Sequence, residues 1–130
     1  MKGTCFVIAA LAILLLIGCS QKKQQEASYR QINMNEAIAM MAEEADYVIL
    51  DVRTPEEFAV GHIPDAINIP NEDIGTAQIP ELPDKAQVIF VYCRSGNRSK
   101  QASEKLAALG YTNIVEFGGI NSWPGEIVTD

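Results

Sequence analysis

Residues 88–109 read VIFVYCRSGNRSKQASEKLAAL, and this stretch decides the fold class. Residues 88–92 are all hydrophobic and give the strongest strand signal in the chain. A polar loop follows at residues 93–98, and residues 99–109 place apolar side chains on one face of a helix. Gly110 then supplies a C-terminal stop. The stretch therefore predicts a buried strand, a tight loop and a helix in direct succession.

The same alternation of strands and helices extends through the rest of the chain. Four further strands are expected, at residues 30–33, 47–50, 66–69 and 113–117. One helix is expected to start at a cap on Asn33 or Asn35 and to run to about Glu44. The residues expected on its inner face are Ala37, Ile38 and Met41.

The start of a second helix is marked by side chains that can cap it. Thr54 precedes Pro55 at the first helical position, and Glu57 completes a capping box. This helix is expected to end near Gly61, and residues 71–86 to form a connection. Strands that alternate with helices indicate an α/β fold, with a roughly five-stranded parallel sheet and helices on both faces.

Length and charge limit the classes of function. The chain has 130 residues, enough for one well-packed domain. Its 17 acidic residues outnumber its 10 basic ones, and the formal net charge is −7. Nucleic-acid binding needs a basic face, so no nucleic-acid partner is expected.

The first residues have the pattern of an export signal. Lys2 precedes an uncharged run of 14 residues, from Cys5 to Gly18. That length suits the hydrophobic region of a signal peptide and is shorter than the roughly 20 residues of a membrane-spanning helix. The run ends in Leu16-Ile17-Gly18-Cys19, which resembles a bacterial lipobox. This resemblance implies cleavage before Cys19 and attachment of lipid to its thiol.

These features predict a signal peptide at residues 1–18, a lipidated flexible tether at residues 19–28 and a globular domain at residues 29–130. We expect the protein to be exported and anchored through lipid on Cys19 to a bacterial membrane, facing the periplasm or the cell exterior. Two alternatives stay open. One is an ordinary secretory signal in which Cys19 is incidental, and the other is an uncleaved anchor, which the length disfavours.

The cysteines argue against a metal site. Cys5, Cys19 and Cys93 show no pairing at metal-ligand spacing, and His62 is the single histidine, so neither a metal nor a cofactor is expected. After cleavage and lipidation, Cys93 would be the only free thiol. A lone thiol in an exported protein is potentially reactive.

Cys93 stands where the predicted buried strand meets the loop. Sites in parallel α/β sheets form beyond the carboxyl ends of strands. Free N–H groups and the dipole of the following helix favour the thiolate, which is the form that attacks. Four of the basic residues gather here and should attract an anion: Arg94, Arg98, Lys100 and Lys105. A buried core cysteine is the alternative, and the arginine-flanked polar loop argues against it.

Several stretches, in order, resemble motifs of the rhodanese family. Residues 50–58 (LDVRTPEEF) and 61–70 (GHIPDAINIP) resemble its first conserved region, and residues 92–99 (YCRSGNRS) resemble its active-site loop. The closing region is matched by Leu109-Gly110-Tyr111, Gly118-Gly119-Ile120 and Trp123. The resemblance covers about residues 30–128 and is to the single-domain rhodaneses.

This resemblance implies a sulfurtransferase with Cys93 as its catalytic nucleophile. The donor would be a small thiosulfate-type anion, whose outer sulfur forms a persulfide on the cysteine with release of sulfite. Cyanide, a thiol or a partner protein would then accept that sulfur. Arg98 would help to neutralise the anionic donor. The persulfide would be held by the backbone amides of Arg94, Ser95, Gly96, Asn97 and Arg98.

Other polar residues of these motifs are expected to support the site. Asp51 could be a general base, but we favour a structural role in which it bonds loop amides and pairs with an arginine, with Arg53 as a second supporting residue. His62 is expected to be a turn residue satisfied by backbone rather than an acid–base group. Trp123 is expected to pack near the rim of the pocket.

Three other functions fit the loop less well. Cysteine phosphatases and arsenate reductases place an arginine six positions after the cysteine, whereas Arg98 is five positions after Cys93. The shorter loop suits a sulfane sulfur better than a phosphate. A rhodanese-like persulfide carrier or binding module is a second alternative. A thiol redox protein is a third, and it would need a resolving cysteine.

Overall fold

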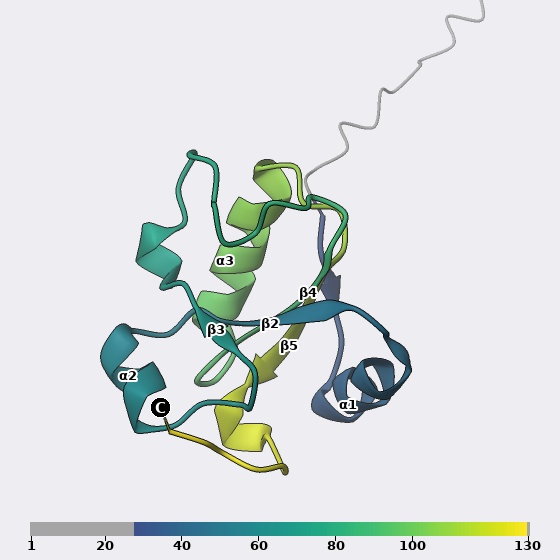
Figure 1. The fold of residues 1–130 in the computed structure, drawn as a ribbon, viewed down its shortest axis with the longest axis vertical. Coiled ribbons are helices and arrows are strands. Elements are labelled where there is room, and N and C mark those ends of the chain that lie inside the picture. The colour runs from purple at the N-terminus through teal and green to yellow at the C-terminus, as the bar shows by residue number, and fades with distance from the viewer. Residues whose placement is uncertain (1–27, 130) are drawn as a thin grey trace, which may run out of the picture.

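The computed structural model describes residues 28–129 (Figure 1). The predicted signal peptide and the predicted lipidation site Cys19 lie outside the described residues, as does nearly all of the predicted tether. Within residues 28–129, no helix has both the length and the hydrophobicity that crossing a bilayer requires.

One parallel sheet of five strands forms the centre of the fold (Figure 1). The strands are β1 (Arg30–Gln31), β2 (Tyr47–Asp51), β3 (Ile67–Asn68), β4 (Val88–Cys93) and β5 (Ile114–Gly119). Their spatial order is β1-β5-β4-β2-β3, and all neighbouring strands pair in parallel. Because β4 is the middle strand, its last residue, Cys93, lies at the centre of the carboxyl edge. The predicted five-stranded α/β fold is confirmed.

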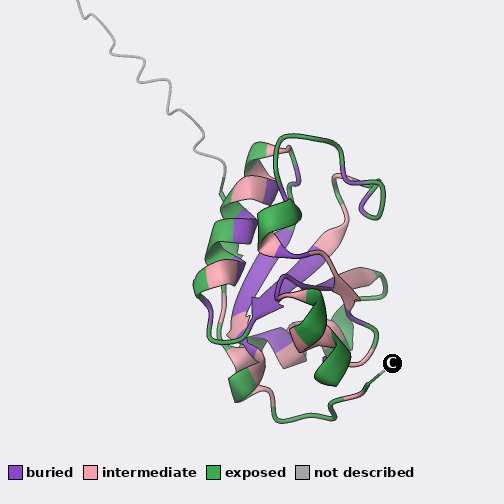
Figure 2. Cartoon of the chain, turned by 90° about the vertical axis from the view of Figure 1, so that its left-hand side faces the viewer, coloured by how far each residue is buried: buried purple, intermediate pink, exposed green. Residues whose placement is uncertain are grey.

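Helices cover both faces of this sheet, as predicted. They are α1 (Met34–Glu43), α2 (Pro55–Val60) and α3 (Asn97–Ala108), with 3-10 turns η1 (Asn71–Asp73) and η2 (Ile120–Ser122). Side chains of a strand alternate between faces. Val91 of β4 therefore packs in one core with Ala102 and Leu106 of α3, whereas Phe90 packs in the other with Ala37 of α1. Figure 2 shows the central strands buried between these layers.

Side-chain caps start the first two helices. Asn33 caps α1, where its Oδ1 accepts a hydrogen bond from the N–H of Glu36 at 2.9 Å. The alternative cap, Asn35, lies inside the helix. Thr54 and Glu57 form the predicted capping box of α2. A cap of this kind contributes about 1 kcal/mol of stability.

Two predicted boundaries near Cys93 are wrong. α3 begins at Asn97 rather than at Ser99, because the residue before it, Gly96, takes a left-handed conformation (φ 113°) that ends the loop early. β5 runs through Gly119 rather than ending at residue 117, because Gly119 pairs with Cys93 across the sheet. The end of β5 is thereby brought against the loop after β4.

The two edge strands are also shorter than predicted. β1 includes only two of residues 30–33 and β3 only two of residues 66–69, since each has a single neighbouring strand to pair with. On α1, Ala37 is fully buried, whereas Ile38 and Met41 are half-buried.

Gly119 leaves no room for a side chain. A β-carbon at this position would overlap the carbonyl oxygen of Arg94 and lie 2.6 Å from the backbone nitrogen of Ser95. We expect Gly119→Ala to lower the free energy of unfolding by about 2 kcal/mol, because overpacking typically costs about 1–3 kcal/mol. Urea denaturation measures this change. Gly75→Ala is the control, since a β-carbon there meets nothing within 4 Å. Equal stability of the two variants would contradict the close approach.

Candidate active site

Cys93 ends β4, and its side chain is almost completely buried. Residues 94–96 turn from this strand into α3. The sulfur accepts a hydrogen bond from the N–H of Gly96 at 3.0 Å. The thiol also lies 3.4 Å from Oγ of Ser99, in the first turn of α3. The cysteine predicted as a nucleophile is therefore enclosed by the loop and the helix that follow it.

These contacts act on the ionisation of the thiol. Burial alone raises the pKa of Cys93, because an apolar environment disfavours the thiolate. Hydrogen bonds from the Ser99 hydroxyl and from the N–H groups of Ser99, Gly96 and Ser95 outweigh burial and leave the pKa of Cys93 below its ordinary value. The site therefore favours the nucleophilic form of the sulfur.

Behind the thiol lies a polar pair that the sequence analysis missed, formed by Ser99 and Glu116. Both side chains are buried, and Ser99 Oγ donates to Glu116 Oε1 at 2.7 Å. The same carboxylate oxygen accepts from the N–H of Gly118 at 2.9 Å. One signal was present in the sequence: Glu116 is a lone charged residue inside the hydrophobic run of residues 114–117. A charge in a buried strand needs partners.

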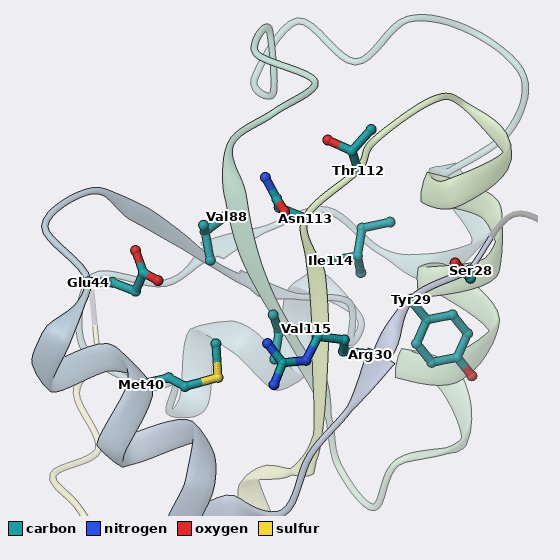
Figure 3. Close-up of a pocket in the computed structure, with 10 residues that line it drawn as sticks. All are labelled: Ser28, Tyr29, Arg30, Met40, Glu44, Val88, Thr112, Asn113, Ile114 and Val115. Carbon is teal, nitrogen blue, oxygen red and sulfur yellow. The ribbon is translucent and has the colours of Figure 1, made fainter.

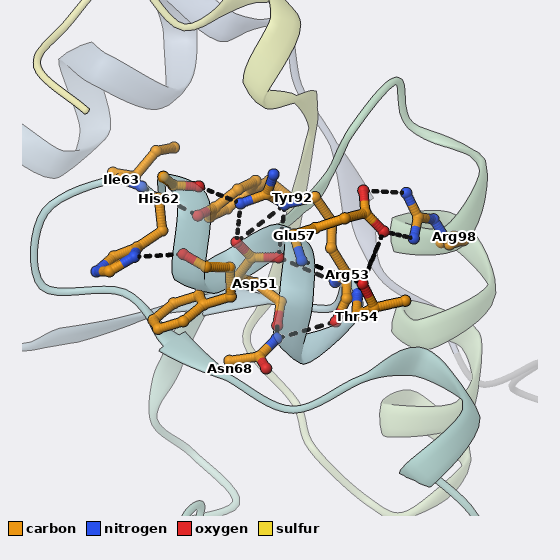
Figure 4. A network of polar contacts seen from close by, with 11 residues as sticks. Asp51, Arg53, Thr54, Glu57, His62, Ile63, Asn68, Tyr92 and Arg98 are labelled. Atoms are coloured by element: carbon orange, nitrogen blue, oxygen red, sulfur yellow. Dashed lines mark hydrogen bonds and ion pairs between the residues drawn. The ribbon is translucent and has the colours of Figure 1, made fainter. Parts of the chain in front are cut away.

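The two arginines of the loop differ in their partners. Arg98 forms a two-pronged ion pair with Glu57 of α2, at 2.6 and 3.0 Å (Figure 4). The hydrogen bond from Arg98 lowers the pKa of Glu57 to about 2. Arg94 is exposed, and within residues 28–129 its side chain makes no hydrogen bond or ion pair. Arg98 thus has a carboxylate partner already, and Arg94 is the loop's exposed positive charge.

The remaining loop and basic residues lie around this core of the site. Ser95 and Asn97 are exposed, whereas Gly96 is buried. Lys105 donates to the carbonyl oxygen of Asn71 at 2.8 Å and to its Oδ1 at 3.1 Å. Lys105 therefore joins α3 to η1 and does not extend toward the cysteine loop.

Asp51 and Arg53 form a buried network at the end of β2 (Figure 4). Arg53 Nη2 lies 2.7 Å from Asp51 Oδ2, and the backbone N–H of Arg53 donates to Asp51 Oδ1 at 2.9 Å. The same Nη2 donates to the carbonyl oxygen of Gly61 at 2.7 Å. These bonds tie the end of β2 to the end of α2, which carries Glu57.

Three aromatic residues of the motifs each have a hydrogen-bonding contact with the backbone. His62 stacks on Phe58, with ring centroids 3.7 Å apart, and its Nδ1 lies 2.9 Å from the Phe58 carbonyl oxygen. The Tyr92 hydroxyl accepts from the N–H of Ile63 at 3.1 Å, and burial raises the pKa of Tyr92. Trp123 is half-buried, packs against the core on the α1 side and donates from Nε1 to the Glu126 carbonyl oxygen.

A polar cavity of about 380 Å³ borders the cysteine loop. Ser95 and Gly96 line it from the loop, Glu116 from β5, Lys100 from α3 and Glu36 from α1. It therefore lies on the side of the loop where the Ser99–Glu116 pair is buried.

A second cavity, of about 220 Å³, lies at the opposite edge of the sheet (Figure 3). It is lined by Val88 and Ile114, which are the first residues of β4 and β5. Because Val88 and Cys93 are the two ends of one strand, this cavity is on the order of 16 Å from the thiol. It is separate from the cysteine site.

Comparisons with known proteins agree with this fold. The family model described as rhodanese-like domain matches residues 33–126. The thiosulfate sulfurtransferase PspE of Escherichia coli (strain K12) is 39% identical over 71 residues, which cover 55% of this chain and 68% of PspE. The adenylyltransferase and sulfurtransferase UBA4 of Meyerozyma guilliermondii is 38% identical over 91 residues, but the chain spans only 21% of that protein.

A solved structure shares the arrangement of strands and helices. The rhodanese-related protein from Thermoplasma volcanium superposes with a TM-score of 0.65 at 32% identity, covering 78% of this chain and 100% of that one. The family match takes in four of the five strands and the whole loop from Cys93 to Ser99. The chain therefore belongs to the rhodanese-like domain family.

Proposed function

We propose that the protein is a sulfurtransferase that carries sulfur as a persulfide on Cys93, from a thiosulfate-type donor to a thiophilic acceptor. The observation that carries this proposal is the buried Cys93 thiol, which accepts a hydrogen bond from the Gly96 N–H and has a lowered pKa. A relative that shares the family is named a thiosulfate sulfurtransferase.

The chemistry needs one nucleophile and two displacements. The Cys93 thiolate attacks the outer sulfur of the donor, the donor's S–S bond breaks, and its electron pair leaves on sulfite. A nucleophilic acceptor such as cyanide, a thiol or a thiol of a partner protein then attacks the outer sulfur of the persulfide. The bond to Sγ breaks and the thiolate is regenerated. Loop N–H groups aimed at the sulfur stabilise the negative charge in both steps.

Positive charge near the cysteine loop allows an acidic protein to bind an anionic donor. The chain carries a net charge of −7, which opposes the approach of thiosulfate. Arg94 is exposed on the loop, and Arg98 is half-buried in the first turn of α3. Glu57 offsets the charge of Arg98 in the ion pair that joins them. Arg94 is therefore the main electrostatic attraction for the donor, and Arg98 adds to it only as far as Glu57 permits.

We also propose that the protein is exported and anchored through lipid on Cys19. The 14-residue apolar run and Leu16-Ile17-Gly18-Cys19 support this proposal. The catalytic domain would then act at a membrane, facing the periplasm or the cell exterior.

Cys93→Ser is expected to abolish sulfur transfer and to leave the fold intact. Serine is close in size to cysteine, but its oxygen forms no persulfide. A thiosulfate:cyanide assay on the full chain in detergent measures the activity, and circular dichroism checks the fold. Residual activity above a few per cent would remove Cys93 from the central role. A parallel assay with an aryl phosphate tests the phosphatase alternative, and turnover equal to that of sulfur transfer would overturn the proposal.

Glu57→Gln is expected to raise kcat/KM for thiosulfate by roughly threefold at low salt, mainly through a lower KM, because it releases the charge of Arg98. Glutamine keeps the acceptor oxygen of the capping box. Since the pKa of Glu57 is about 2, the gain should not vary with pH between 6 and 8. Glu56→Gln, an exposed neighbour on α2, is the matched control. An unchanged or higher KM for Glu57→Gln would show that Arg98 does not act on the donor.

Cys19→Ala is expected to move the full-length protein from the detergent phase to the aqueous phase in detergent partitioning of expressing cells. The physical reason is that acyl chains on Cys19 would supply the membrane affinity. Partitioning of both proteins into the aqueous phase would refute lipidation.

A further inference from the structure

The Ser99 hydroxyl has more acceptors around it than it has protons. Its Oγ lies 2.7 Å from Glu116 Oε1, 2.9 Å from the Gly96 carbonyl oxygen and 3.4 Å from Cys93 Sγ. A hydroxyl donates one hydrogen bond. The shortest contact is to the carboxylate, and charge-assisted bonds are the stronger ones. While Cys93 is protonated, Ser99 therefore donates to Glu116, and the Cys93 thiol donates to Ser99.

Ionisation of Cys93 changes this pattern. When the thiol proton leaves to solvent, the thiolate can only accept hydrogen bonds, so Ser99 stabilises it only by turning its proton toward Sγ. Glu116 then loses the bond from Ser99 and keeps the one from the Gly118 N–H. Two negative groups now stand on either side of one hydroxyl, which disfavours the thiolate. Forming the thiolate therefore costs the Ser99–Glu116 hydrogen bond.

We propose that Ser99 and Glu116 are positioning residues that set the ionisation and the nucleophilicity of Cys93. Glu116 draws the hydrogen bond of Ser99 away from the sulfur, and this opposes the ionisation that the loop N–H groups favour. For the same reason the thiolate, once formed, is less stabilised and more nucleophilic than it would be if Ser99 had no carboxylate partner.

The Ser99–Glu116 pair also affects how readily Cys93 takes up sulfur, an effect that rests on the proposed function. Attack on the donor moves the negative charge from Sγ to the outer sulfur of the persulfide, one bond farther from Glu116. Sγ then no longer needs the hydrogen bond from Ser99, and the Ser99 hydroxyl again donates to the carboxylate of Glu116. Glu116 therefore favours the persulfide over the thiolate.

Other charged groups surround this pair. Lys100 of α3 and Glu36 of α1 line the same cavity as Glu116 and carry opposite charges. Arg98 interacts with the charge of Cys93, but Glu57 of α2 balances it. Ser99 contacts both Glu116 and the sulfur. We therefore expect Glu116 to act on the pKa of Cys93 mainly through the Ser99 hydroxyl.

The test is the pH dependence of Cys93 alkylation by iodoacetamide, on the full chain in detergent. The rate is read from the tryptic peptide of residues 86–94, which contains no other cysteine. Glu116→Gln keeps an acceptor oxygen but removes the charge. It should lower the pKa of Cys93 by about 1, since a hydroxyl bonds more strongly to a charged acceptor than to a neutral one. The plateau rate at high pH should fall about threefold, because nucleophilicity falls with pKa.

Ser99→Ala should shift the pKa in the opposite direction, upward by about 1, because the thiolate loses its hydroxyl donor. Ser99→Thr should restore the native profile. Glu104→Gln, an exposed carboxylate on α3, is the control for a general change of charge and should leave the profile unchanged.

Opposite shifts for Glu116→Gln and Ser99→Ala support the proposal, and general structural damage would not produce them. Shifts in the same direction, or no shift for Glu116→Gln, overturn it. Alkylation needs no sulfur donor, so this result is independent of whether the protein transfers sulfur. If the two variants show the opposite shifts but the wild-type protein fails in the thiosulfate assay, the proposed function alone is refuted.

Discussion

The backbone contact between the end of β5 and the loop after β4 is the constraint on which the site depends. Gly119 pairs with Cys93 and lies against the Arg94 carbonyl, where a side chain would not fit. With β5 held this close, Gly118 and Glu116 reach Ser99 in the first turn of α3. The sulfur is thereby enclosed by loop N–H groups on one side and by the Ser99–Glu116 pair on the other.

Burial disfavours the charged forms of Cys93 and Glu116, and hydrogen bonds compensate for that cost. A thiolate and a carboxylate are both expensive to remove from water. The structure gives each of them backbone N–H donors, from Gly96 and from Gly118. A reactive thiol can therefore be almost wholly buried and still have a lowered pKa. The same burial limits the access of a reagent to the sulfur.

The sequence predicted what depends on local pattern. The five strands, both side-chain caps and Cys93 at the end of a buried strand follow from hydrophobic runs, capping residues and the order of elements. The pairings across the fold could not be predicted in this way. Arg98 and Glu57 are 41 positions apart, and Ser99 and Glu116 are 17 apart. The early start of α3 was missed because it depends on the left-handed conformation of Gly96, which sequence periodicity does not report.

The central claim is that Cys93 accepts one sulfur atom from a thiosulfate-type donor. The most direct measurement is the mass of the peptide of residues 86–94 after the full chain is treated with thiosulfate and digested under non-reducing conditions, together with the sulfite released. The account predicts a gain of one sulfur on this peptide and one equivalent of sulfite per Cys93. An unmodified peptide whose thiol can still be alkylated, with no sulfite released, would contradict it.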